Sequence, residues 1–328
     1  MRKKIVAVIK YLIFLGIGIF FMWWQFSKMT PSQNVQFRES LRHANYIVII
    51  PIVILAILSH LSRAVRWKIM IEPLGYKPST SNTFYATMCG YFANTFVPRA
   101  GEILRCTLLG RYEKIPINKL IGTILVERIF DLFCYVLLVI FTIIIQFGKV
   151  SEFVEAKVLQ ISNKNAGLPW IKILSIAALF ILLFFLMAKG ILKKYARHRY
   201  IIRLRGLHMG LKEGITSILR LKKRRSFLLQ SAFIWFLYLS QIYIGFYALS
   251  ATAGLGLGAA FSVLSLATLA IIVAPGGIGA FPVAVQQVLL IYSIDNISFG
   301  WLMWGTTTAI IIIVGLISFG LLIYSNKK

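Results

Sequence analysis

The chain has 328 residues, of which 59% are hydrophobic and 14% are charged, and its 36 lysines and arginines outnumber its 10 aspartates and glutamates. Apolar runs of about 18 or more residues recur along it, which excludes an ordinary soluble domain and predicts an all-α polytopic membrane protein. The net charge of +26 does not indicate nucleic-acid binding, because the cations gather between apolar runs, as in the cytoplasmic loops of membrane proteins.

Six of these runs are long enough to be full transmembrane helices. They cover residues 5–26, 46–71, 118–147, 170–188, 227–249 and 299–324. The basic start Arg2–Lys4 is not followed by a small-x-small cleavage site, which predicts an uncleaved first helix that begins in the cytoplasm. Alternating crossings then place both termini in the cytoplasm and the protein in the cell membrane.

The second run ends in basic sequence, where Arg63 and Arg66 are expected to form a secondary basic edge on the cytoplasmic side. A first break, "PRAG" at 98–101, then separates two apolar arms. Each arm has about 14–16 residues, too few to cross a hydrocarbon core of about 30 Å. Proline breaks a helix and glycine permits a sharp turn, so we expect a re-entrant hairpin that enters from the cytoplasm. The alternative is a kink in a continuous span.

The third run is followed by an expected outer loop at 148–169. The cation-rich loop 189–226 comes after the fourth run, and Glu213 is the only acidic residue among its cations, which predicts a cytoplasmic loop facing anionic lipid. Two further hypotheses stay open, namely that this loop docks a soluble synthase and that the protein is a homo-oligomer.

A second break, "PGGIGAFP" at 275–282, repeats the hairpin pattern with flanks free of lysine and arginine, so this hairpin is expected to enter from outside. The chain therefore reads as a single membrane domain, 1–328, whose halves at about 5–147 and 170–324 form an inverted repeat. Matching broken helices in inverted halves are typical of transporters with a site near the membrane midplane.

Three ionisable residues, Glu127, Arg128 and Asp131, interrupt the third apolar run. An ionised side chain at the centre of a membrane helix costs about 2.5–3.5 kcal/mol on insertion scales, so such residues face partners or water. We interpret Glu127 and Asp131, together with Glu102, as ion-pair or proton-coupling residues. The alternative is a purely structural ion network.

The first break brings Arg99, Glu102 and Arg105 close together in sequence at the expected start of a helix. Helix N-termini and arginine side chains both bind phosphate, and Glu102 is expected to pair with Arg128. The candidate lipid-headgroup residues are Arg99, Gly101, Glu102, Arg105, Arg128, Gly276, Gly277 and Gly279. The sequence contains no recognisable metal-binding, cofactor-binding or catalytic motif, so none of these is expected.

Four stretches, "SRAVRWKIMIEPLG", "FVPRAGEILR", "VERIFD" and "APGGIGAFP", resemble the lysylphosphatidylglycerol synthase transmembrane-region family, also called flippase-like. The resemblance implies movement of an aminoacylated lipid or a related lipid between leaflets. Phe281 and Pro282 stand where the family often has a glutamate after its glycine motif. The resemblance does not include the soluble aminoacyl-transferase domain, so lysyl-lipid synthesis is not implied.

Taken together, these features predict a flippase or scramblase-like transporter of an anionic phospholipid or lipid-linked molecule, with membrane lipids as its partners. The alternative hypothesis is a membrane-embedded protein related to glycosyl- or aminoacyl-transferases that act on lipid-linked substrates. The transporter hypothesis involves no making or breaking of covalent bonds, whereas the transferase hypothesis would make the protein an enzyme.

Overall fold

The computed structural model describes residues 16, 20, 22–97, 100–162 and 221–327, and all regular secondary structure in these ranges is helical. Four of the helices are long and apolar enough to cross a membrane, and the chain is a multi-pass membrane protein. These four coincide with the second, third, fifth and sixth apolar runs of the sequence.

Several expected features fall outside the described residues. They are the fourth run at 170–188, most of the first run at 5–26, and the basic loop up to residue 220. Pro98 and Arg99 of the first break also lie outside them.

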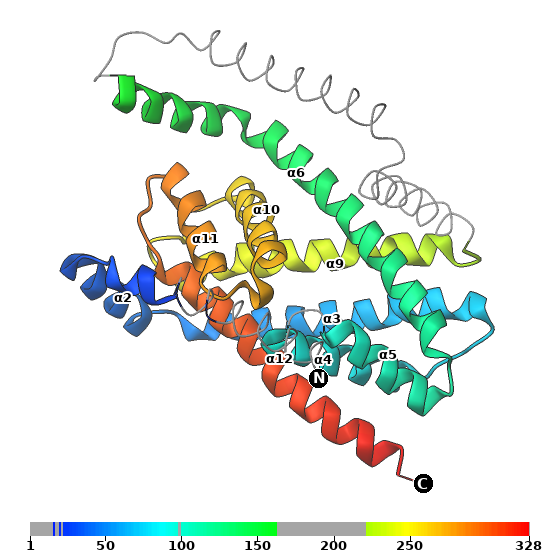
Figure 1. Ribbon diagram of the computed structural model, residues 1–328. Coiled ribbons are helices and arrows are strands. Elements are labelled where there is room, and N and C mark those ends of the chain that lie inside the picture. Colours follow the sequence, from blue (N-terminus) through cyan, green and yellow to red (C-terminus); the bar gives the residue numbers. More distant parts are fainter. Residues whose placement is uncertain (1–15, 17–19, 21, 98–99, 163–220, 328) are drawn as a thin grey trace, which may run out of the picture.

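Within each of the described ranges 22–97, 100–162 and 221–327, short connections join consecutive helices (Figure 1). In chain order they are α2 (Pro31–Arg42), α3 (Ile49–Ile71), α4 (Thr80–Phe96), α5 (Ala100–Glu113), α6 (Ile117–Ser162), α9 (Arg224–Gly245), α10 (Leu257–Val273), α11 (Ala280–Ile291) and α12 (Ser298–Ser325). Short 3₁₀ turns are η1 (Tyr46–Val48), η2 (Glu72–Leu74), η3 (Phe246–Ala248) and η4 (Pro275–Gly277).

Helix α2 was not predicted from the sequence, although its start carries a recognisable signal. The Thr30 hydroxyl accepts a hydrogen bond from the amide of Gln33 at 3.2 Å, and the Gln33 carboxamide accepts one from the amide of Thr30 at 3.0 Å. This reciprocal pair is a capping box, and Pro31 stands at the first helical position, where its missing N–H is harmless.

Helix α6 extends to Ser162, so the expected outer loop was wrong for residues 148–162. The stretch after Lys149 contains neither proline nor glycine up to Ser162, and a helix that has started can continue through it one hydrogen bond at a time.

Helices α3 and α9 run antiparallel and lie side by side through the middle of the molecule (Figure 1). Near one end of the pair, Nη1 of Arg66 donates a hydrogen bond to the Ser231 hydroxyl at 3.1 Å. Near the other end, the amide of Asn45 donates to the carbonyl of Ala248 at 2.8 Å. This pair joins the first half of the described chain to the second half.

Two further helix contacts join the first half of the described chain to the second half. Helix α4 packs antiparallel to α12, and Nδ2 of Asn326 donates a hydrogen bond to Oδ1 of Asn82 at 3.0 Å. Helix α10 packs antiparallel to α6, where the Tyr135 hydroxyl donates to the Ser265 carbonyl at 3.0 Å. The first helix of each broken pair, α4 or α10, therefore packs against the long last helix of the other half, α12 or α6.

Each break separates two helices that fold back on one another, α4 on α5 and α10 on α11, rather than bending one continuous helix. Close backbone approach makes the first pair possible, because a Cβ added at Gly90 would lie 2.8 Å from the carbonyl oxygen of Gly101. Glycine at both positions leaves room for this contact.

Candidate functional site

The second break is built from glycines in a conformation that other residues rarely adopt. Gly276, Gly277 and Gly279 have φ values of 67°, 66° and 70°. The indole N–H of Trp304, on α12, donates a hydrogen bond to the carbonyl of Gly276 at 2.8 Å. The break is thus a fixed, non-helical segment of backbone that a neighbouring helix holds in place.

This glycine segment packs against the end of α4, one turn before the first break. A Cβ added at Gly276 would lie 3.7 Å from the carbonyl oxygen of Thr95. The interruptions in the two helix pairs are therefore close together in space, although they are far apart in sequence.

At the first break, two backbone amides already have partners. The amide of Gly101 donates to the Asn94 side-chain oxygen at 2.8 Å, and the amide of Ala100 donates to the carbonyl of Val97 at 3.1 Å. From the sequence we expected the start of a helix here that, like other helix N-termini, would bind phosphate through its backbone amides. Two of those amides instead close the turn.

Glu127 on α6 is the centre of a buried ion network. Its Oε2 lies 2.6 Å from Nη2 of Arg105 on α5, and its Oε1 lies 3.0 Å from Nη2 of Arg66 on α3. The side chains of these three residues are at most 3% exposed. Nε of Arg63, also on α3, lies 3.9 Å from Oε1 of Glu127.

Asp131 completes this network one helical turn further along α6. Its Oδ1 lies 2.7 Å from Nη2 of Arg66, and its Oδ2 bonds to Nη2 of Arg63. The arginine–carboxylate network, defined as Arg63, Arg66, Arg105, Glu127 and Asp131, joins α3, α5 and α6 and holds three cations against two carboxylates. It carries one excess positive charge in the interior.

Aromatic rings cover two of the buried guanidinium groups. Arg105 lies 4.5 Å from the ring centre of Trp67, and Arg66 lies 5.6 Å from that of Phe227. The Trp67 indole in turn donates a hydrogen bond to the Thr123 hydroxyl at 2.8 Å. These rings exclude water from the cations and attract them by cation–π interaction.

From the sequence we interpreted Glu127 and Asp131 as ion-pair or proton-coupling residues and placed Arg63 and Arg66 at a basic edge. Both arginines point into the network instead, and the side chain of Arg66 is fully buried. Their spacing of three residues is the signal that could have revealed this, because it places both on one side of α3, where they can face a common partner.

A second pair, Arg128 and Glu102, lies at the surface beside this network. Nη2 of Arg128 lies 3.0 Å from Oε1 of Glu102, and the two side chains are 41% and 28% exposed. Oε2 of Glu102 is buried and has no hydrogen-bond partner among the residues that the structure describes. The flanking residues Ile103 and Leu125 are exposed and apolar, so the charged pair interrupts an apolar surface.

Further buried polar atoms lie between the network and the first break. Arg63 lies 5.8 Å from the ring centre of Tyr91, which in turn is 5.0 Å from the ring of His60. The Tyr91 hydroxyl and Nδ1 of His60 are buried without a hydrogen-bond partner in the described part of the chain. Polar groups thus continue from Asp131 towards the region where the two breaks meet.

Comparison with known proteins gives one family and one related protein. The family described as "Lysylphosphatidylglycerol synthase TM region" matches residues 8–318. The UPF0104 membrane protein MJ1595 of Methanocaldococcus jannaschii is 31% identical over 144 residues, which are 43% of this chain and 40% of that protein. The match thus spans less than half of that relative's length. No solved structure matches the chain.

Proposed function

The chain belongs to the lysylphosphatidylglycerol synthase transmembrane-region family, and we propose that it is a flippase or scramblase-like transporter. Its cargo in this proposal is an anionic phospholipid or a lipid-linked molecule, which it moves between the two leaflets of the bilayer.

The observation that carries the proposal is the contact between the second break and the end of α4. Irregular backbone at membrane depth is tolerated only where it is buried in protein or lines a water-filled cavity. Transporters built from inverted repeats place such interruptions together at the substrate site, near the midplane. The reciprocal packing of α4 on α12 and of α10 on α6 supports an inverted repeat with two re-entrant hairpins.

The Arg128–Glu102 pair is the proposed docking point for the lipid headgroup. Arg128 lies about three turns after Ile117, about 16 Å along α6, close to the middle of a hydrocarbon core of about 30 Å. A phosphate arriving from the apolar surface would replace Glu102 as the partner of Arg128, because arginine binds phosphate and carboxylate with the same geometry. The second-break glycines would contact the headgroup further inside, and Arg99 stays a candidate headgroup residue from the sequence.

The buried network provides the positive field that holds an anion near this point. Its excess charge comes from Arg63, Arg66 and Arg105, which are fixed by Glu127 and Asp131 and do not need to move. Glu102 is the best placed proton carrier, because it is partly exposed and loses its cation when cargo binds. In the proposed topology the protein lies in the cell membrane with both termini in the cytoplasm. Loop 189–226 also lies on the cytoplasmic side, where it faces anionic lipid or a soluble synthase.

The test uses the full chain in liposomes with fluorescent phosphatidylglycerol, and in parallel with a fluorescent polyprenyl phosphate. A membrane-impermeant reductant reports how fast the label crosses the bilayer. We expect movement faster than in protein-free vesicles, and a loss of about tenfold or more in Arg128→Gln, which corresponds to about 1.4 kcal/mol of barrier. Arg111→Gln, an exposed cation at the end of α5, is the matched control and should transport normally.

Rates equal to those of protein-free vesicles for every lipid would refute the proposal. Equal rates for wild type and Arg128→Gln would refute the headgroup assignment while leaving transport intact. Release of a new product from a nucleotide sugar and a lipid acceptor would instead favour the transferase alternative.

A further inference from the structure

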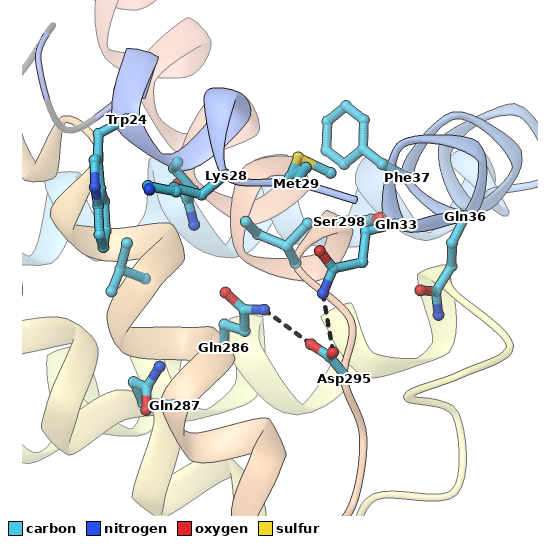
Figure 2. Close-up of a pocket in the computed structure, with 13 residues that line it drawn as sticks. Trp24, Lys28, Met29, Gln33, Gln36, Phe37, Gln286, Gln287, Asp295 and Ser298 are labelled. Carbon is cyan, nitrogen blue, oxygen red and sulfur yellow. Dashed lines mark hydrogen bonds between the residues drawn. The ribbon is translucent and has the colours of Figure 1, made fainter. Parts of the chain in front are cut away.

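A cavity of about 240 Å³ lies at the other end of the helices from the network, among α2, the chain that precedes it, α11 and the start of α12 (Figure 2). Ligand pockets usually measure about 300–1,000 Å³, so this cavity has room for one small group and not for a lipid chain. In the topology proposed above, it faces the outside.

The polar residues that line this cavity differ from those of the arginine–carboxylate network. Its polar side chains are mainly carboxamides, which come from Gln25, Gln33, Gln36, Gln286 and Gln287. A carboxamide both donates and accepts hydrogen bonds, and so does a hydroxyl group. The two charged side chains in the described part of the lining, Lys28 and Asp295, have opposite signs and cancel one another's charge.

Two of the carboxamides are held in place before any ligand arrives. Nε2 of Gln286 donates to Oδ1 of Asp295 at 2.9 Å, and Nε2 of Gln33 donates to Oδ2 at 3.2 Å (Figure 2). Asp295 therefore joins α2 to α11 and fixes two lining groups. Such preorganisation lowers the entropic cost of binding.

Other polar groups in the lining lack partners although they are buried. Gln25 is 6% exposed, and neither polar atom of its carboxamide has a hydrogen-bond partner among the described residues. The hydroxyl of Ser298, a residue that is 1% exposed, likewise lacks a partner within these residues. Buried polar groups normally have partners, because leaving them unpaired destabilises the fold. These atoms expose less than 1 Å² each, so a ligand with several hydroxyl groups would satisfy them once the two side chains turn towards the cavity that their residues line.

We propose that this cavity binds a neutral, hydroxyl-rich group of the size of one sugar ring, either as a free sugar or as the headgroup of a glycolipid. The aromatic rings of Trp24 and Phe37 line the cavity and offer apolar surface to the C–H groups of such a ring. A phosphate is a poor fit, because Lys28 is the only cation among the described lining residues and Asp295 would repel an anion. The site does not depend on the proposed transport activity.

The test is equilibrium binding to the full chain, purified in a detergent whose headgroup is not a sugar. Methyl glucoside tests the free sugar, nanodiscs with a monoglucosyl diacylglycerol test the glycolipid, and nanodiscs with phosphatidylglycerol test an anionic headgroup. We expect saturable binding of one or both glucosyl probes. The dissociation constant should rise about tenfold or more in Gln25→Leu, as expected for the loss of a buried hydrogen bond.

The matched control is Gln241→Leu, because Gln241 is also 6% exposed but does not line the cavity. It should bind the glucosyl probe like wild type. Gln25→Leu removes buried polar atoms that lack partners, so it should melt at a temperature equal to or above that of wild type, which separates lost binding from lost folding. Gln287→Ala, on the exposed side of the cavity, should weaken binding as well.

Three results would overturn the proposal. They are no saturable binding of either glucosyl probe, unchanged binding in Gln25→Leu, and a preference for phosphatidylglycerol over both glucosyl probes. Each of these can occur with transport intact, and transport can fail with sugar binding intact.

Discussion

Replacing Glu127 with alanine should destabilise the protein far more than replacing Glu102, although both carboxylates pair with arginine. Glu127→Ala leaves Arg105 without the carboxylate that its guanidinium contacts at 2.6 Å, in a site where both side chains are at most 3% exposed. Arg66 loses its contact at 3.0 Å and keeps Asp131 as its carboxylate partner. The change therefore creates a buried cation without a counter-charge.

The magnitude follows from this burial. Removing one partner of a buried ion pair costs about 3–5 kcal/mol, because the remaining charge stays desolvated. A change of 1 kcal/mol shifts the melting temperature by about 2–4 °C for chains of 150–250 residues, so Glu127→Ala should lower it by about 6 °C or more. The exposed pair of Glu102 and Arg128 is worth about 0.2–1 kcal/mol, so Glu102→Ala should lower the melting temperature by less than about 4 °C.

The assay is thermal unfolding of the detergent-purified protein, followed by tryptophan fluorescence. A double variant, Glu127→Met with Arg105→Met, should recover part of the loss, because it removes the unpaired cation together with its former partner. Equal melting temperatures for Glu127→Ala and Glu102→Ala would contradict the assignment of Glu127 as the centre of a buried network. Failure of the double variant to recover stability would show that the cost comes from lost packing.

Two further predictions concern the glycines of the helix pairs, and thermal unfolding tests both. Gly101→Ala should destabilise the α4–α5 pair by about 1–3 kcal/mol, because the added methyl group would overlap the carbonyl of Gly90 and lie 2.6 Å from Cγ of Asn94. Gly122→Ala is the control, because a methyl group added there meets open space and should not destabilise the protein. A loss of stability in Gly122→Ala would contradict the packing argument. Gly276→Ala should cost about 1–2 kcal/mol because its φ is 67°. Gly305→Ala is the control, and equal melting temperatures for these two variants would contradict the strained conformation.

The sequence predicted the four spans that the structure describes, and the breaks at 98–101 and 275–282, because both are local properties. An apolar run of sufficient length predicts a membrane helix, and proline with glycine predicts a break, without reference to the rest of the chain. The charged residues inside the third run were also visible, because Glu127 and Asp131 are out of place in apolar sequence.

The pairing of Arg128 with Glu102 was predicted and is present, but the buried arginine partners of Glu127 and Asp131 were not predictable in the same way. Arg66 stands near the basic end of its helix, where sequence alone favours an interfacial location, and only the packing of α3 against α6 brings it to Glu127. The Gln25 cavity was missed for a similar reason. Its lining comes from two segments, 24–37 and 283–298, that are about 250 residues apart, and single glutamines in a sequence carry no signal of a shared site.

The two helix pairs differ in one respect that bears on energetics. Ionisable side chains surround the first pair, whereas the segment from Leu257 to Ile291 contains no lysine, arginine, aspartate or glutamate. If the two helix pairs exchange roles in the proposed transport cycle, the inward-open and outward-open conformations would differ in free energy, because the two pairs pack alike but do not carry the same charges. One of the two conformations would then be more populated at rest. A membrane potential would change the free-energy difference between them by about 2.3 kcal/mol per elementary charge moved across 100 mV.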